Sequence, residues 1–315
     1  MDKRKYKIKL TRKNYGWWLI SILLILIIIG IIRSWITPDS NYLDPIIWLI
    51  NLPLKIFRTS LVQVYDPNIG PNFEEMLRGI GSGVYLTVVM SLISVVLGFL
   101  LAALLAVILV EGERTKQKKN ERRGVKKYID FIITELAQFY VNFFRSTPLM
   151  VQILLVYFGL LTPMSTLSDI INASWFNPDV ILGTLALTLN TAAYQAEIIR
   201  SGILAIPAGQ TEAARALGLT QSQTMKEVIL PQAVRIIIPP LTNEAINVLL
   251  NSSLVSAISV LEITLRSKHF QSETFQWWVF LIAAFYYFVV AFSLSKLTKR
   301  LEVKMHIPGL GVQND

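Results

Sequence analysis

An uncharged stretch from Val84 to Val110 constrains this chain more than any other feature of its sequence. It is longer than the roughly 20 residues that an α-helix needs to cross the hydrocarbon core of a bilayer. Other apolar stretches recur along the chain, in which 53% of the residues are hydrophobic and 16% are charged. We therefore expect an all-α integral membrane protein with six transmembrane helices. The predicted spans are Trp17 to Ile32, Val84 to Val110, Leu149 to Leu161, Val180 to Ala196, Ile236 to Val260 and Trp277 to Ser295.

The distribution of Lys and Arg predicts how these spans are oriented. Twenty-two of these residues lie in segments 1–16, 111–130, 202–235 and 296–315, and four lie in the alternating segments 37–76, 162–179 and 261–275. This asymmetry is typical of the positive-inside rule. We expect a multi-pass protein of the plasma (inner) membrane with both termini cytoplasmic. The net charge of +9 then reflects orientation and contact with anionic membrane lipid, and we expect no nucleic-acid partner.

Three regions follow from this pattern. Residues 1–79 hold a basic tail, the first span and a proline-containing exterior segment, residues 80–298 form the main membrane domain, and residues 299–315 form a cytoplasmic tail. The basic start and first apolar run resemble a signal peptide, but no small-residue cleavage site follows, so we expect an uncleaved anchor. The chain has no cysteine and two distant histidines, which predicts neither a disulfide nor a metal site.

A helix break is predicted at the stretch "FFRSTPLM". As one helix, the chain from Tyr128 to Leu161 would be about 50 Å long, which exceeds one straight span. Pro148 suits the first turn of a new helix, and Ser146 or Thr147 suits its cap. Two interpretations stay open, a simple proline kink and a broken helix whose free backbone groups hold a ligand.

The stretch "GQTEAARALGLT", Gly209 to Thr220, is rich in small residues within an apolar chain. It predicts a short helix that Gly218 ends in a left-handed turn. Thr220 and Gln223 then form a capping box for a second helix, which we expect Pro231 to end. The first helix is too short to be stable alone, so its Ala face must pack into a groove. The residues alone leave open whether that groove belongs to this chain or to a partner.

The stretch "EAARALGLTQSQTMKEVILPQA" resembles the signature loop of inner-membrane permease subunits of ATP-binding-cassette (ABC) importers. The resemblance rests on Glu212, Ala213, Ala214, Gly218, Ile229, Leu230 and Pro231. The motifs "FRSTPLMVQILLVYFGL", "AAYQAEIIRSGILAIPAGQTEAA", "LPQAVRIIIP" and "NSSLVSAISVLEI" resemble the polar amino acid branch of that family, in order, over about residues 80–298. Ser146 and Asn251 depart from the family pattern, where Gly is usual at the first position and Lys is frequent at the second.

The resemblance implies a type I importer core of five helices, preceded here by one extra helix. It implies a permease that forms the pathway for a polar amino acid and couples it to a separate ATPase. Its partners would be two ABC ATPase subunits, a second permease subunit (the same chain or a paralogue) and an extracytoplasmic amino-acid-binding protein. No phosphate-binding loop is present, so we expect no catalytic residue and no cofactor in this chain, with ATP and Mg in the partner ATPase. Alternatives are an importer for another small polar solute, an ion-gradient-driven secondary transporter, and a purely structural membrane anchor.

The same resemblance assigns the short helix as a coupling helix that sits in a groove of the ATPase subunit. The predicted interface consists of Gln210, Thr211, Glu212, Ala213, Ala214, Arg215, Ala216, Leu217 and Gly218.

The predicted substrate site joins the helix break to one face of the next span. Arg145, with Ser146 and Thr147 at the break, offers a cation and free N–H groups to a carboxylate. Asn190, Tyr194 and Glu197 share one helical face, and Glu197 suits an amino group. The alternatives are an interface-seeking Arg145 and a Glu197 paired with Arg200 on its own helix.

A polar stripe of Asn243, Asn247 and Asn251 recurs every four residues in the fifth predicted span. Such a stripe faces other helices or a water-filled path. We expect either a pathway or gate, or hydrogen bonds between helices.

Overall fold

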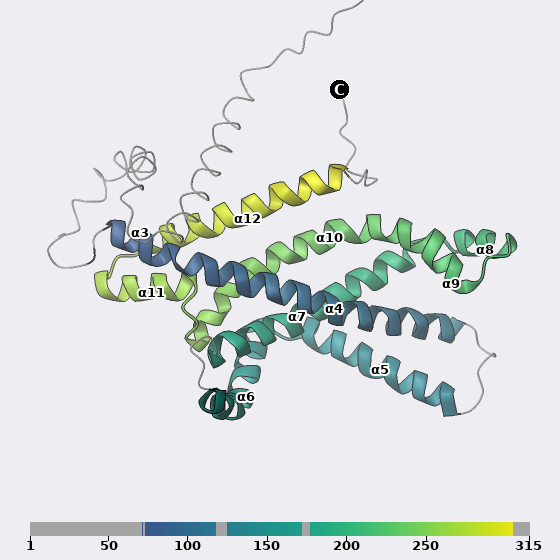
Figure 1. Cartoon of the computed structure of the whole chain (residues 1–315), viewed down its shortest axis with the longest axis horizontal. Helices are drawn as coiled ribbons and strands as arrows, with labels where there is room; N and C mark the ends of the chain where they lie inside the picture. Colours follow the sequence, from purple (N-terminus) through teal and green to yellow (C-terminus); the bar gives the residue numbers. More distant parts are fainter. Residues whose placement is uncertain (1–70, 72, 118–124, 172–176, 305–315) are drawn as a thin grey trace, which may run out of the picture. The chain divides into compact units, whose positions relative to one another are not determined.

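The computed structural model describes residues 71, 73–117, 125–171 and 177–304, and almost all of these residues are helical (Figure 1). The predicted first span lies outside the described residues, and the domain boundaries at residues 79 and 298 stay predictions. The elements are α3 Phe73–Gly81, α4 Gly83–Gln117, α5 Val125–Ser146, α6 Leu149–Ile171, α7 Pro178–Leu204, α8 Ala208–Ala216, α9 Gln221–Gln223, the π-helical turn η2 Thr224–Ile229, α10 Leu230–Asn251, the 3-10 segment η3 Ser252–Ile258, α11 Ile263–Thr274 and α12 Val279–Lys304.

Four helical stretches of the described residues are long and apolar enough to cross a membrane. They are Phe73–Glu113, Leu149–Leu167, Gln221–Ile258 and Val279–Arg300. These four stretches confirm the predicted spans that begin at Val84, Leu149, Ile236 and Trp277. The predicted span from Val180 lies within α7, a continuous helix of 27 residues that is not among the four. Buried polar residues such as Thr188, Asn190 and Gln195 lower the hydropathy of α7.

Helix α7 lies at the centre of the described bundle, in contact with α4, α5, α6 and α10. Small residues let α4 approach it closely. A Cβ atom added to Gly98 of α4 would lie 2.5 Å from Cγ2 of Thr191 in α7. Ala102 and Ala196 are fully buried in the same seam. Small residues are the usual means by which membrane helices approach each other.

The ends of the bundle separate the segments that the charge pattern assigned to opposite sides. Helices α8 and α9, the end of α4 and the start of α5 lie at one end of the long axis in Figure 1, and α3 and α11 lie at the other. The described residues of the predicted cytoplasmic segments, 111–117, 125–130 and 202–235, therefore share one end. Which end faces the cytoplasm stays a prediction.

The helix that follows α8 does not end at Pro231, so that prediction was wrong. The chain stays helical from Gln221 through α9, η2 and α10 to Asn251. In η2 the turn widens, and the N–H of Leu230 donates to the carbonyl of Met225, five residues earlier. Proline has no N–H and its ring collides with the carbonyl four residues before it, so a wide turn just ahead of Pro231 lets the helix continue.

Candidate functional site

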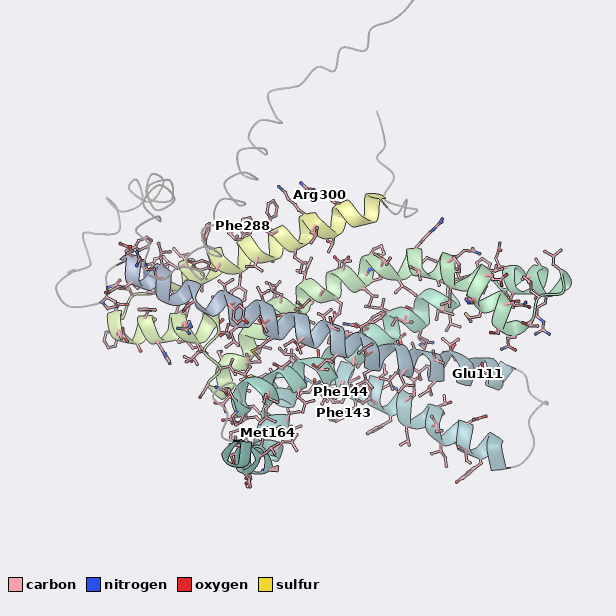
Figure 2. The ribbon with its side chains drawn as sticks, viewed as in Figure 1. Glu111, Phe143, Phe144, Met164, Phe288 and Arg300 are labelled. Atoms are coloured by element: carbon pink, nitrogen blue, oxygen red, sulfur yellow. The ribbon has the colours of Figure 1, made fainter. Side chains whose placement is uncertain are left out.

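The predicted helix break is present between α5 and α6. Helix α5 ends at Ser146 and α6 begins at Leu149. The labels of Phe143 and Phe144, in the last turn of α5, mark this region in Figure 2. The Thr147 hydroxyl donates to the carbonyl of Phe143 at 2.8 Å, so it bonds back to α5 where we had expected a cap for α6.

Buried side-chain amides form hydrogen bonds with the polar groups of this break. Gln152, which is 2% exposed, donates from Nε2 to the carbonyls of Phe144 and Thr147 at 2.9 and 3.0 Å and to the Thr147 hydroxyl at 2.7 Å. Asn190 of α7 donates from Nδ2 to Oε1 of Gln152 at 2.9 Å. The predicted site residue Asn190 therefore supports the break from within. Sequence reasoning missed Gln152, whose signal is an amide in an otherwise apolar helix start.

Three predicted substrate residues come together where α5 faces α7. An Nη atom of Arg145 lies 3.7 Å from Oε2 of Glu197. The guanidinium of Arg145 lies over the Tyr194 ring, 5.8 Å from its centroid. The Arg145 side chain is 40% exposed, and the separation of 3.7 Å is too long for a hydrogen bond. Arg145 is therefore held loosely, whereas Ser146 lies exposed at the end of α5.

Glu197 is held much more firmly by Arg200 on its own helix. Arg200 donates to the two carboxylate oxygens of Glu197 at 3.0 and 2.5 Å, and it also pairs with Glu113 of α4. The intrahelical pair is thus the arrangement that the structure adopts. An amino group that approached Glu197 would compete with Arg200 for its two oxygens.

Helix α8 divides the predicted interface residues into an inner and an outer set. Ala214 is 4% exposed and faces the inside of the loop, where α8 packs against η2. Ala213 is exposed, and Leu217 is 84% exposed. The small side chain at 214 therefore fits a groove in this chain, whereas the surface free for a partner lies around Ala213 and Leu217. The exposed set also includes Gln210, Glu212, Arg215, Ala216 and Gly218, and Thr211 is intermediate.

Both predicted helix signals around α8 are present. Gly218 has φ +87°, which is the left-handed conformation, and the N–H groups of Gly218 and Leu219 donate to the carbonyls of Arg215 and Ala214. This pattern is the Schellman helix end. Thr220 and Gln223 form the capping box, in which each side chain bonds the backbone of the other. Hydrogen bonds within this chain therefore fix both helix ends of the loop without a partner.

The asparagine stripe of α10 is exposed at all three positions, Asn243, Asn247 and Asn251. Asn247 donates from Nδ2 to Oε2 of Glu244 at 3.4 Å. Glu244 is 8% exposed, and sequence reasoning missed it although a carboxylate within an apolar span was its signal. In the described chain the stripe therefore makes little hydrogen-bond contact between helices.

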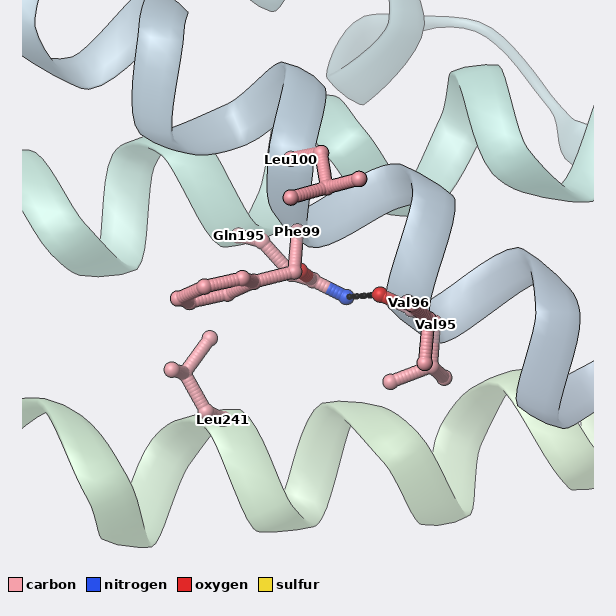
Figure 3. A pocket seen from close by; sticks show the side chains of 6 residues that line it. All are labelled: Val95, Val96, Phe99, Leu100, Gln195 and Leu241. Atoms are coloured by element: carbon pink, nitrogen blue, oxygen red, sulfur yellow. Dashed lines mark hydrogen bonds between the residues drawn. The ribbon is translucent and has the colours of Figure 1, made fainter.

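A hollow of about 230 Å³ lies among α4, α7 and α10 (Figure 3). Gln195 of α7 is 1% exposed and donates from Nε2 to the carbonyl of Val95 at 3.4 Å. Its Oε1 atom is buried and accepts no hydrogen bond within the described chain. The other lining residues are apolar: Val95, Val96, Phe99, Leu100 and Leu241.

A second buried carboxylate, Glu262, lies between the last two apolar stretches. Its oxygens accept from the N–H groups of Thr264 and Leu265 at 2.8 Å, so it caps α11, and from the Tyr287 hydroxyl at 2.6 Å. Burial raises the pKa of Glu262, while these hydrogen bonds oppose the rise. Its bonds are all internal, so we assign it a structural role.

The comparisons with known proteins agree with this arrangement. Residues 125–307 match the family described as binding-protein-dependent transport system inner membrane component. The chain is 41% identical over 214 residues to the arginine transport system permease protein ArgU of Corynebacterium glutamicum, covering 65% of this chain and 61% of that protein. It is 33% identical over 224 residues to a putative glutamine transport system permease protein GlnP of Rickettsia conorii, covering 71% of this chain and 91% of that protein.

Solved structures have the same fold. A crystal structure of an amino acid ABC transporter with histidines matches with a TM-score of 0.60 and 33% identity, over 74% of this chain and 99% of that one. An inward-facing structure of the MetNI methionine ABC transporter matches with a TM-score of 0.58 at 19% identity, again over 74% and 99%, which supports the fold alone.

Proposed function

The chain belongs to the binding-protein-dependent transport system inner membrane components, and on that premise we propose that it forms the pathway through which an importer moves a polar amino acid. It is a permease subunit of an ABC importer, and ATP hydrolysis takes place in a separate subunit. The observation that carries the amino acid assignment is the similarity, over the same region, to relatives named for arginine and glutamine and to an amino acid transporter structure.

Arg145 supports this assignment because it is a loosely held, partly exposed cation at the helix break. A substrate carboxylate that approached α5 would meet the guanidinium above Tyr194. Glu197 is already neutralised by Arg200, so we assign it the role of positioning the Arg145 cluster. Thr147 and Asn190 hold the break in shape, and Ser146 lies at its exposed edge.

Two exposed surfaces support the proposed partners. Around Ala213 and Leu217, α8 offers small and apolar contact area to an ATPase subunit, and two such subunits would serve two permeases. Asn243, Asn247 and Asn251 would be costly against lipid, so a second permease subunit or the pathway between two subunits covers them. A binding protein delivers the substrate on the opposite side from α8, and both termini are cytoplasmic.

Reconstitution tests the proposal. The permease, its ATPase and its binding protein are placed in liposomes, and uptake of labelled arginine, glutamine and histidine is measured with and without ATP. We expect uptake of at least one of them that requires all components and ATP. Uptake driven by an ion gradient without the ATPase would establish a secondary transporter, and uptake only of some other polar solute would refute the amino acid assignment.

Reporter fusions test the orientation separately. A reporter after Lys119 should behave as cytoplasmic, and one placed within 162–179 as exterior, because the basic residues concentrate in the first segment. Access to residues 111–130 from outside would overturn the topology.

A further inference from the structure

One buried amide replaces the backbone donors that are missing at the helix break. Pro148 has no N–H, so the carbonyl of Phe144, four residues earlier, loses the bond that a continuous helix would give it. The N–H of Val151 donates to the carbonyl of Pro148, which leaves the carbonyl of Thr147 without its helical partner as well. The Nε2 atom of Gln152 donates to both of these free carbonyls, at 2.9 and 3.0 Å.

Gln152 is isolated among apolar neighbours in α6. It is the only residue with a polar side chain between residues 149 and 156, and it is 2% exposed. An amide in such a place costs free energy unless its polar atoms form hydrogen bonds. Its Oε1 atom accepts from Nδ2 of Asn190 in α7 at 2.9 Å, so both ends of the amide are used. This one side chain therefore joins α5, α6 and α7.

The two carbonyls that Gln152 binds lie on either side of Arg145 in the chain. The guanidinium of Arg145 reaches the ring of Tyr194, which lies about one turn beyond Asn190 on α7. The backbone around Arg145 is thus fastened to α7, while the Arg145 side chain stays 40% exposed. A fixed backbone and a free guanidinium suit a residue that meets a substrate carboxylate.

We propose that Gln152 is a positioning residue for substrate binding, which holds the end of α5 so that Arg145 faces the substrate. The proposal rests on the amino acid pathway and on the role of Arg145 proposed above. Gln152 is buried and its amide is bonded within the chain, so it does not touch the substrate itself. Its effect on transport passes through the backbone at the break.

Uptake by the assembled complex of permease, ATPase and binding protein in liposomes tests this effect. Gln152→Met keeps the length of the side chain and removes its hydrogen bonds. With labelled arginine, glutamine and histidine at saturating binding protein, we expect uptake of the transported amino acid to fall at least about tenfold, while basal ATP hydrolysis persists. Val151→Met, at the 47% exposed neighbouring position, is the matched control and should transport normally.

A double variant separates positioning from a general structural role. In an Arg145→Gln background, Gln152→Met should cause no further loss of uptake, because no cation is left to position. A general structural role would instead make the two losses multiply.

A spin label reports the position of the break without any transport. The permease has no cysteine, so a label on Ser146→Cys, in a complex whose other subunits lack cysteine, reports the end of α5 alone. We expect this label to be more mobile in Gln152→Met than in the parent, and unchanged in Val151→Met. The label also decides the case in which Arg145→Gln leaves no uptake to compare.

Four results would overturn the inference while amino acid transport itself would stand. They are uptake by Gln152→Met at the parent rate, multiplied losses in the double variant, an unchanged label, and normal uptake by Arg145→Gln. If Gln152→Met does not accumulate, Gln152→Glu takes its place, since it keeps the shape without the NH2 group. Failure of both variants to accumulate would assign Gln152 to folding alone. A parent complex that takes up no amino acid would instead refute the proposed function.

Discussion

Helices α7 and α10 lie in contact, yet they are covered to very different extents. Between residues 178 and 200 of α7, Tyr194 is the single exposed position, although this helix is rich in Thr, Asn and Gln. Helix α10 belongs to one of the four apolar stretches, yet it exposes Asn243, Asn247 and Asn251. The more polar helix, α7, is therefore the better covered by its neighbours, and the more apolar helix, α10, is the more exposed.

The difference teaches which surfaces this chain satisfies by itself. The polar groups of α7 bond to neighbouring helices, as Asn190 does to Gln152 and Thr191 to Glu244. The asparagines of α10 and the outer face of α8 have no comparable cover within the described chain. We infer that α7 is an internal scaffold, whereas α8 and α10 are completed by other subunits or by substrate.

The largest effect is expected in the seam between α4 and α7. Gly98→Leu would place side-chain atoms where Cγ2 of Thr191 lies, so the helices would be forced apart at a cost of about 1–3 kcal/mol or more. We expect most of the protein to be lost from the membrane fraction in a quantitative immunoblot. Val107→Leu, at a 65% exposed position of the same helix, is the control and should accumulate normally. Normal accumulation of Gly98→Leu would show that this seam is not tightly packed.

Two adjacent alanines of α8 test the opposite kind of surface. Ala213→Trp adds bulk on the exposed side, so the permease should reach the membrane normally but no longer copurify with the ATPase. Ala214→Trp adds the same bulk on the buried side and should disturb the loop itself, lowering permease accumulation or protease resistance. Intact ATPase binding by Ala213→Trp would move the interface away from this face of α8.

Tyr194, the exposed position in the middle of α7, lies beneath the guanidinium of Arg145, which leads to a prediction about Arg145. Arg145→Gln removes the cation above Tyr194 and should reduce uptake at least about tenfold, while basal ATP hydrolysis by the complex persists. Arg235→Gln, an exposed arginine of α10, should transport normally. Normal uptake by Arg145→Gln at normal expression would return Arg145 to the role of an interface anchor.

A smaller effect is expected where α8 ends. Gly218 has a positive φ with open space around it, so a side chain there strains the backbone by about 1–2 kcal/mol without a collision. Gly218→Val should lower substrate-stimulated ATP hydrolysis several-fold, and Gly218→Asn should lower it less, because Asn tolerates this conformation. Equal effects of Val and Asn would show that the backbone conformation is not what matters.

Local signals in the sequence predicted much of the fold. Apolar length identified four spans, Gly218 and the Thr220–Gln223 pair identified the ends of helices, and "RSTP" identified the break. These signals succeed because each depends on residues close together in the chain. Pro231 misled us because the cost of a proline depends on the turn before it, and η2 absorbs that cost.

Pairings between helices were harder to predict. The face shared by Tyr194 and Glu197 followed from spacing, and Arg145 does lie there. The pair of Glu197 with Arg200 was one of the alternatives that spacing offered. That Asn190 bonds to Gln152 and that Ala214 points inward depend on how neighbouring elements pack. Glu244 and Gln195 were overlooked because their burial depends on neighbouring helices, as their bonds to Thr191 of α7 and to Val95 of α4 show.

The π-helical turn η2 has a geometric consequence for the whole of α10. A π turn takes one residue more than an α turn, so everything after it is rotated by about 100° relative to an uninterrupted α-helix. Because η2 lies between α8 and α10, this rotation sets the direction in which the asparagine stripe and Glu244 face relative to the proposed ATPase interface on α8. One added residue, and not any particular side chain, thus sets how the two proposed functional faces of the subunit are oriented relative to each other.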